Sequence, residues 1–208
     1  MFVSTLRSCF YLLLAAFLCV LVLPASAQLP PPGYNSHWRT ADGSEKLALE
    51  FGGGWDLAMG AARQSETRGW NYMMGAGYNF NRHLALLGEY GFNHFTVPPQ
   101  PKLSDTIPIS GSLHIWSVTA DPKFQYFATD RVGAYVIGGG GFYRTSNHSD
   151  ADNGEANDAG GVNFGTGIAL KVSDNSDAKF YAEGRYTWID NKPTPHTTYI
   201  PLTMGIRW

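Results

Sequence analysis

The segment KFYAEGRYTW, residues 179–188, alternates strictly between two kinds of side chain. One set of positions carries Phe180, Ala182, Gly184, Tyr186 and Trp188, and the other carries Lys179, Tyr181, Glu183, Arg185 and Thr187. This alternation is typical of a β-strand with two unlike faces. In a soluble protein the aromatic face points into the core, whereas in a membrane barrel the aromatic face meets lipid and the charged face meets the lumen. The choice between these two orientations decides what the chain can do.

Seven further segments have strand character. They cover residues 46–56, 70–80, 84–95, 113–127, 132–144, 161–172 and 198–208. Pro122 lies within the fourth of the eight segments and cannot donate to a ladder, so it predicts a strand end or a bulge there. The fifth segment, VGAYVIGGGGFYR, is apolar or Gly on both sides, and its orientation stays open. The sequence therefore predicts an all-β chain of eight strands.

The connections between the predicted strands alternate in length. The second, fourth and sixth strands are followed by the short segments NRH, ATD and SDNSDA. The other connections are longer and polar, and include TVPPQPKLSDTIPISGS and TSNHSDADNGEANDAG, which we interpret as loops. Up-and-down connection places all the long loops at one end, which is typical of outer-membrane barrels with short periplasmic turns.

The N-terminus has the pattern of a secretory signal. Arg7 precedes an apolar run of roughly 14 residues, which is short for a membrane-spanning helix and so disfavours a retained anchor. Ala25 and Ala27 fit the small-x-small cleavage pattern, which predicts cleavage after Ala27. We therefore expect a signal peptide at 1–27, an irregular proline-rich lead-in at 28–45 and a barrel at 46–208.

Cysteine content and charge narrow the possible functions of the mature chain. Cys9 and Cys19 both lie in the predicted signal, so the mature chain can form no disulfide, thiolate metal site or cysteine nucleophile. Without Arg7 it has 14 basic residues against 17 acidic ones, which does not favour a nucleic-acid partner. It also lacks an apolar stretch near 18 residues, which excludes a spanning helix after the signal.

The polar faces of the predicted strands carry balanced charge. Their ionisable residues are Glu50, Glu89, Asp121, Lys123, Lys171, Glu183, Arg185 and Arg207, four acids and four bases. A narrow lumen requires such a balance, because an unpaired charge away from water is costly. The opposite faces are nearly free of charge and rich in aromatic residues near the strand ends, as in the girdles of a lipid-facing surface. An eight-stranded barrel is just wide enough for side chains to fill, so we expect a charge network that closes the lumen.

Three segments resemble the small eight-stranded outer-membrane β-barrel family of the OmpA transmembrane domain and OmpX type. They are the terminal strand YIPLTMGIRW, the strand FYAEGRYTW and the segment VGAYVIGGGGFYR. The resemblance implies an eight-stranded antiparallel up-and-down transmembrane β-barrel in the bacterial outer membrane, with both termini in the periplasm. It also implies that the terminal residues form a signal for the barrel-assembly machinery: Leu202, Met204, Ile206 and Trp208. Phe is the commoner last residue in that family.

The functional expectation is a non-enzymatic protein with a structural or surface-interaction role through four outer loops. Outer-membrane lipid and lipopolysaccharide would be its partners, and we expect a monomer without a cofactor. The alternative is a conduit for small solutes or hydrophobic ligands, which would need a gap in the charge network. A soluble secreted cup is a third possibility, and fractionation without detergent would identify it.

The sequence patterns give little support for a catalytic or a metal site. Some small barrels resemble lipid A deacylases or acyltransferases, for which His114 with Ser117, or His148 with Ser149, would be the candidates. Residues three apart on a regular strand point to opposite faces, so the first pair cannot cooperate. The loop SDADNGEAND lacks acids at the key EF-hand positions, and divalent ions bridging it to lipopolysaccharide remain an alternative to a solvated loop. We therefore predict no catalytic, metal or cofactor site.

Overall fold

A computed structural model describes residues 46–59, 69–100, 109–149, 152–173, 177–191 and 196–208. The predicted signal and lead-in, with Ala25 and Ala27, lie outside the described residues. Within the described part, no helix is long and apolar enough to cross a membrane. The chain forms strands β1 (Leu47–Met59), β2 (Gly69–Asn79), β3 (Leu84–Gln100), β4 (Ile109–Ala128), β5 (Val132–Ser149), β6 (Asp152–Lys171), β7 (Lys179–Ile189) and β8 (Thr197–Arg207).

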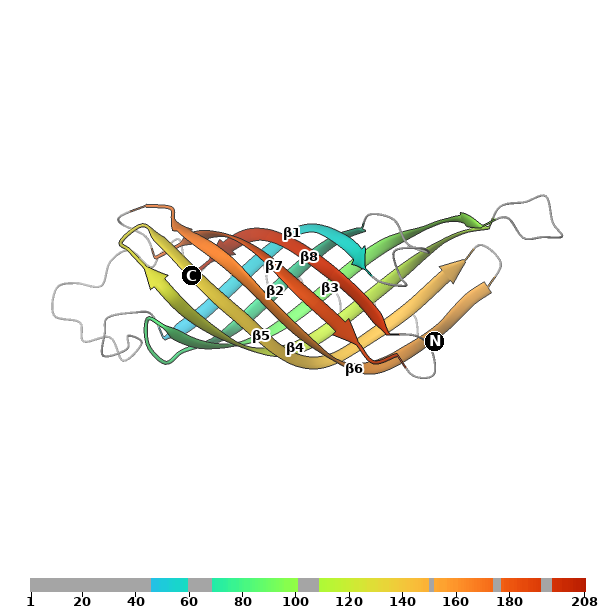
Figure 1. Ribbon diagram of the computed structural model, residues 1–208, viewed down its shortest axis with the longest axis horizontal. Helices are drawn as coiled ribbons and strands as arrows, with labels where there is room; N and C mark the ends of the chain where they lie inside the picture. The colour runs from blue at the N-terminus through green and yellow to red at the C-terminus, as the bar shows by residue number, and fades with distance from the viewer. Residues whose placement is uncertain (1–45, 60–68, 101–108, 150–151, 174–176, 192–195) are drawn as a thin grey trace, which may run out of the picture. The chain divides into compact units, whose positions relative to one another are not determined.

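The strands form one closed barrel in chain order (Figure 1). Each strand pairs antiparallel with the next, and β8 closes on β1. A row of paired residues that starts at Leu49 and is followed once around the barrel returns to β1 at Met59, ten residues further along. Such a stagger tilts the strands by roughly 40° to the axis, and each row of paired residues climbs toward the long-loop end from β1 to β8.

Burial alternates along the strands and settles which face is inside. On β7, Glu183 and Arg185 are buried, whereas Phe180 and Tyr186 are exposed on the outside. The orientation of β5, which the sequence left open, is also fixed: alternate residues Gly133–Thr145 point inward, and Phe142 points outward with 80% of its surface exposed. The prediction of ions toward the axis and rings toward lipid therefore agrees with the burial of both strands.

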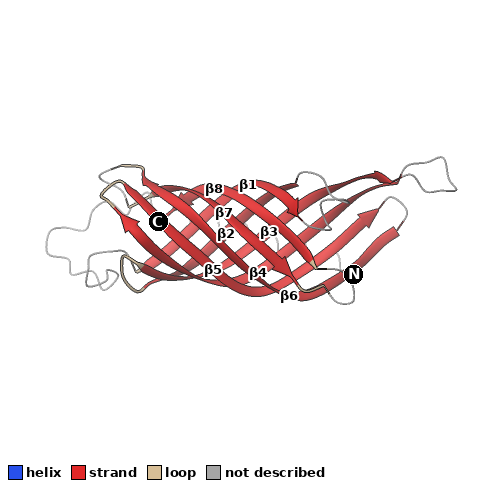
Figure 2. Cartoon of the chain, in the orientation of Figure 1, coloured by secondary structure: helices blue, strands red, loops and turns tan. Residues whose placement is uncertain are grey.

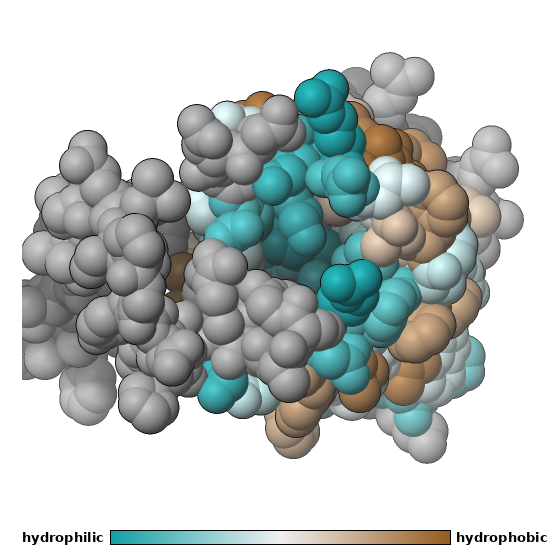
Figure 3. Space-filling view, turned by 90° about the vertical axis from the view of Figure 1, so that its left-hand side faces the viewer, coloured by the Kyte–Doolittle hydropathy of each residue, from teal (hydrophilic) through white to brown (hydrophobic). Residues whose placement is uncertain are grey.

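Outward-facing aromatic residues gather near both ends of the wall. Tyr78, Phe80, Phe124, Tyr126 and Trp208 lie toward the short turns, and Trp55, Trp70, Trp116 and Trp188 lie toward the long loops. Trp116 and Phe124 are eight residues apart on β4, about 20 Å along the axis of a strand tilted by about 40°. This separation suits the apolar band of outer-membrane barrels, which is ≈ 25 Å tall. Viewed from the short-turn end, the described residues form a hydrophilic recess inside an apolar exterior (Figure 3).

Four strands extend by at least four residues beyond their predicted ends. Residues 96–100, 109–112, 145–149 and 152–160 belong to β3, β4, β5 and β6, so the prediction that they are loops is wrong. Beyond the apolar band both faces of a strand meet water, so the hydrophobic alternation ends there. The backbone pairing nevertheless continues. We call these four segments the outer sheet, and Figure 2 shows it extending past the ends of the shorter strands.

The prediction that Pro122 ends a strand or makes a bulge is also wrong. Pro122 lies inside β4, opposite Leu86 of β3. Pairing of β4 with β5 runs to Ala120 and resumes at Lys123 in the same register. The missing N–H therefore removes a ladder bond without shifting the strands, and the bulge occurs further on, at Tyr126.

Candidate functional site

The candidate site is a set of buried charges that crosses the interior of the barrel. Arg185 of β7 donates from both terminal nitrogens to the Glu89 carboxylate of β3, at 2.5 and 2.8 Å. Its Nε donates to Glu183 on its own strand, and Asp121 of β4 lies 3.7 Å from Nη1. One guanidinium thus joins carboxylates from three strands, and its planar fork suits this paired geometry.

A second arginine extends the set toward the short-turn end. Arg207 of β8 binds Glu50 of β1 through Nε at 2.6 Å, and its Nη2 also contacts that carboxylate. The same nitrogen lies 3.8 Å from Glu183 Oε2. The guanidinium stacks over the rings of Tyr135 and Tyr181, with 4.7 and 4.6 Å from its carbon to the ring centres. Glu183 therefore links the two arginines into one continuous cluster.

We call this set the charged cluster; its members are Glu50, Glu89, Asp121, Glu183, Arg185 and Arg207. Lys123 is also buried and lies over the Tyr135 ring at 5.6 Å. Lys171, the last predicted member, is the final residue of β6 and lies only partly buried at the short-turn end. The structure thus brings most of the predicted lumen residues together and places Lys171 away from the centre.

The predicted charge network of the lumen left out two inward-facing charged residues. Asp56 of β1 is fully buried, and Lys179 of β7 is partly buried on the lumen side. Both occupy the same alternate positions as predicted lumen residues of their strands. The two-residue alternation of each strand alone could therefore have identified them. With these two, the inward-facing side chains that the structure describes on the strands include five acids and five bases.

Glycines on the inner face make room for the charged side chains. A Cβ at Gly75 of β2 would lie 2.8 Å from the Cγ of Glu50 and 3.1 Å from the Cγ of Glu89. A Cβ at Gly165 of β6 would lie 2.6 Å from the Cγ of Arg185. Any larger residue would therefore displace a member of the charged cluster.

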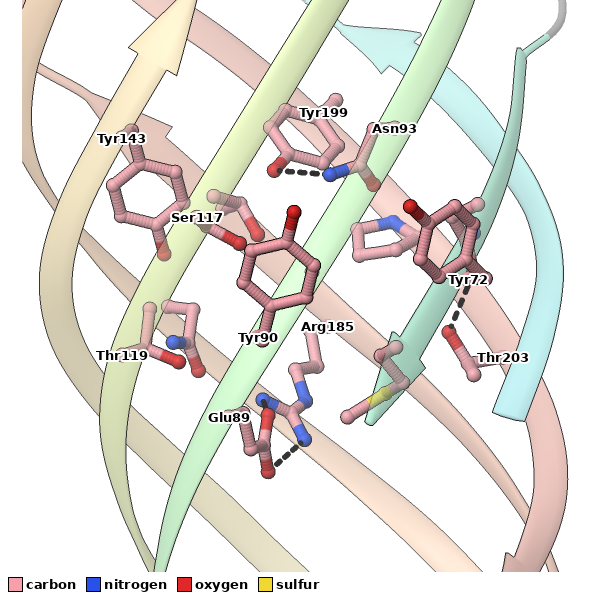
Figure 4. A pocket seen from close by; sticks show the side chains of 16 residues that line it. Tyr72, Glu89, Tyr90, Asn93, Ser117, Thr119, Tyr143, Arg185, Tyr199 and Thr203 are labelled. Atoms are coloured by element: carbon pink, nitrogen blue, oxygen red, sulfur yellow. Dashed lines mark hydrogen bonds and ion pairs between the residues drawn. The ribbon is translucent and has the colours of Figure 1, made fainter. Parts of the chain in front are cut away.

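A polar tier lies beside the charged cluster, toward the long loops (Figure 4). Asn71 donates to Asp56 at 2.8 Å and accepts from the Thr203 hydroxyl at 3.1 Å. With its amide turned to satisfy both groups, Asn93 donates to Asp56 at 3.2 Å and accepts from the Tyr199 hydroxyl at 3.3 Å. A cavity of about 50 Å³ is lined by Asn71, Asn93, Tyr199 and Thr203, and it also touches Arg185 and Glu89 of the charged cluster.

Apolar side chains close the interior on both sides of these polar groups. The lower apolar tier, toward the short turns, consists of Ala48, Leu87, Tyr135, Ile137, Ala169 and Tyr181. The upper apolar tier, toward the long loops, consists of Phe95, Leu113, Ile115, Tyr143, Ile189 and Tyr199. Most of the charged cluster and the polar tier therefore lie between these two apolar tiers.

A model of the family described as "Outer membrane protein beta-barrel domain" matches residues 13–205. The chain belongs to this family. It is thus an outer-membrane β-barrel, which confirms the predicted fold class and the predicted location in the bacterial outer membrane. No curated protein matches it.

Solved outer-membrane barrels are similar to this one. Neisserial surface protein A is 16% identical with a TM-score of 0.59, and the match covers 77% of this chain and 95% of that chain. The N-terminal barrel of Pseudomonas aeruginosa OprF is 15% identical with a TM-score of 0.47, covering 77% and 97%. Ail of Yersinia pestis, in complex with the heparin analogue sucrose octasulfate, is 16% identical with a TM-score of 0.47, covering 78% and 97%. At these identities the similarity to Neisserial surface protein A shows the fold alone.

The terminal strand of this outer-membrane barrel closes the wall. Leu202, Met204 and Ile206 point outward, and Trp208 exchanges two backbone hydrogen bonds with Leu49 of β1, of 2.8 and 3.2 Å. The predicted assembly residues thus form a lipid-facing row at the seam where the last strand meets the first. Recognition of these residues by the barrel-assembly machinery remains a prediction.

The weak catalytic candidates occupy different sides of the wall. His114 packs on the outside against Phe92, with 5.5 Å between ring centres, and Ser117 is on the inner face beside Gly91. Their separation on a regular strand follows the predicted alternation. His148 is exposed in the outer sheet, and the side chain of Ser149 lies outside the described ones. Among the described residues, no group of three metal-ligating side chains could hold a metal ion.

Proposed function

We propose that this outer-membrane barrel is a non-enzymatic protein with a closed lumen that acts through its outer surface. The observation that carries the proposal is the charged cluster, in which carboxylates and guanidiniums from β1, β3, β4, β7 and β8 meet across the axis. Charges that are paired this closely in a buried interior resist separation, because each would be left uncompensated.

The dimensions of the interior favour a closed lumen over a conduit. The cavity of about 50 Å³ has room for a few water molecules, and the upper apolar tier lies between it and the long loops. A solute would have to displace both the apolar tier and the paired arginines. A hydrophobic ligand would meet the charged cluster itself, which offers it no apolar path.

The outer sheet supports a surface role. β4 and β6 each contain 20 residues, whereas β2, β7 and β8 each contain 11, so four strands extend their ladder well beyond the apolar band. The described side chains of this extension include polar ones that face the medium, among them Asn147 and Asp158. We propose that it contributes to envelope integrity or to surface contacts, that outer-membrane lipid and lipopolysaccharide surround the barrel, and that the protein acts as a monomer assembled by the barrel-assembly machinery.

Conductance of the purified protein in planar lipid bilayers tests the closed lumen. We expect no steady current at neutral pH, and a steady current would favour the conduit. Complementation of a deletion strain tests the surface role: the full chain should restore resistance to detergent, and a chain with a shortened β5–β6 hairpin should fold without restoring it. Full restoration by the shortened chain would show that the outer sheet is not needed for envelope integrity.

A further inference from the structure

Three histidines form a row on the outside of the barrel. His94 of β3, His114 of β4 and His148 of β5 come from adjacent strands and share the outward face. Their ring centres lie 4.9 Å apart between His94 and His114, and 5.5 Å apart between His114 and His148. They are distant in the sequence, and only the register of the three strands brings them together. We call them the histidine row.

The histidine row lies just beyond the lipid-facing rings at the long-loop end. His94 follows Phe92 by two positions on the same face, and His114 occupies the corresponding place beyond Trp116. The ring of His94 packs against Trp70 at 5.5 Å, and that of His114 against Phe92 at 5.5 Å. Aromatic girdles mark the interface between acyl chains and head groups, so the row lies at the level of the outer head groups.

The charges around the row leave it without a protein counter-ion among the described side chains. His94 and His148 face His114 from β3 and β5, and Trp70 faces His94 from β2. Among the side chains that the structure describes on the adjoining strands, the outward-facing charged ones are Arg144 of β5 and Asp158 of β6, which pair with each other at 3.6 Å. If the three rings become protonated, three positive charges stand side by side, and an external anion would relieve their repulsion.

We propose that the histidine row binds phosphate groups of the outer-leaflet glycolipid when the medium becomes mildly acidic. Acidification protonates imidazole rings, and each protonated ring of the row is then a cation that an anion can bind. Phosphate binding and protonation then favour each other, because an anion that binds only the charged rings stabilises them by mass action. The proposal depends on the outer-membrane location and not on the closed lumen.

The position of the row favours a lipid-borne phosphate over a dissolved one. The rings stand beside Trp70, which belongs to the aromatic girdle, so an anion anchored in the bilayer is already held at the right height. A dissolved phosphate would first have to lose its freedom of movement to reach the same place. The site would therefore fasten the base of the outer sheet to the lipid surface in acid.

A pH titration of the histidine rings by NMR tests the proposal, with the full folded chain in nanodiscs. One set of discs contains phosphatidylcholine alone, and a second contains phosphatidylcholine with bisphosphorylated lipid A. We expect the titration midpoint of His114 to rise by about one pH unit in the lipid A discs, which is a tenfold gain in proton affinity. His196, at the same end of the barrel beside Trp188 and Asp190, reports the general effect of a negative bilayer surface.

Controls distinguish specific phosphate binding by the histidine row from the general effect of a negatively charged bilayer surface. In the variant His94→Gln/His148→Gln, the shift of His114 should fall to that of His196, and dephosphorylated lipid A should give no excess shift in the native chain. Equal shifts of His114 and His196 in the lipid A discs would overturn the proposal. An equal shift of His114 from inorganic phosphate added to phosphatidylcholine discs would overturn the lipid-borne source.

Discussion

Removal of Arg185 is the most informative perturbation of the charged cluster. The change Arg185→Leu keeps much of the side-chain volume and deletes the group that contacts Glu89 at 2.5 and 2.8 Å and lies 3.7 Å from Asp121. The carboxylates remain buried, and the arginine that stays near Glu183 is the more distant Arg207, at 3.8 Å. Breaking a buried pair by removing one partner costs about 3–5 kcal/mol, so we expect a loss of that size in the free energy of unfolding.

Arg144→Leu is the matched control. Arg144 pairs with Asp158 at 3.6 Å on the outer surface, where their side chains are 62% and 74% exposed. An exposed pair of this kind contributes about 0–1 kcal/mol. Both variants therefore delete one paired arginine from the same barrel, and they differ in burial and in the number of carboxylates left behind.

Equilibrium unfolding in urea, with the protein in phospholipid vesicles, measures both variants. Heat-modifiable migration on gels reports the closed barrel, and tryptophan fluorescence reports its insertion. The double variant Glu89→Gln/Arg185→Leu should lose less stability than the sum of its single variants, because the neutral amide no longer needs a cation. If Arg185→Leu and Arg144→Leu lowered the free energy of unfolding by the same amount, the charged cluster would be solvated and our reasoning refuted.

Three further predictions concern the inner face, the seam and the lipid-facing wall. Gly75→Ala should destabilise the barrel by about 1–3 kcal/mol in the same urea assay, whereas Gly88→Ala, which faces outward with its nearest contact at 3.6 Å, should change little. Deletion of Trp208 removes two backbone bonds to Leu49 at the seam and should lower outer-membrane levels on immunoblots; normal levels would argue against a signal role. Phe164→Arg should cost about 2–4 kcal/mol in vesicles, and a neutral result would place Phe164 away from lipid.

Much of the fold could be predicted from the alternation of side chains along each strand and from the lengths of the connections. Eight alternating segments and alternating connection lengths were enough to predict strand number, topology and the inward position of Glu183 and Arg185. The two apolar faces of the segment 132–144 gave no such signal, and only pairing with β4 and β6 fixed its orientation. Asp56 and Lys179 lie within the predicted segments and on the same alternate positions as Glu50 and Glu183, so the alternation already placed them in the lumen.

The remaining features depend on register, which alternation does not report. Arg185 meets Glu89 across the barrel although 96 residues separate them, and the tilt of the strands determines that they share a height. The histidine row arises in the same way from three strands. The outer sheet was missed because water on both faces removes the hydrophobic signal, while the paired backbone of each hairpin continues.

Accessibility of neighbouring residues to lipid tests the orientation of the wall most directly. Cys9 and Cys19 both lie in the predicted signal, so single-cysteine variants of the mature chain can be labelled cleanly with a nitroxide. Phe164 is 65% exposed and the adjacent Asn163 is 7% exposed. A label at Phe164→Cys should relax rapidly with oxygen dissolved in the bilayer, and a label at Asn163→Cys should not. The reverse result would place the rings inside and contradict the account.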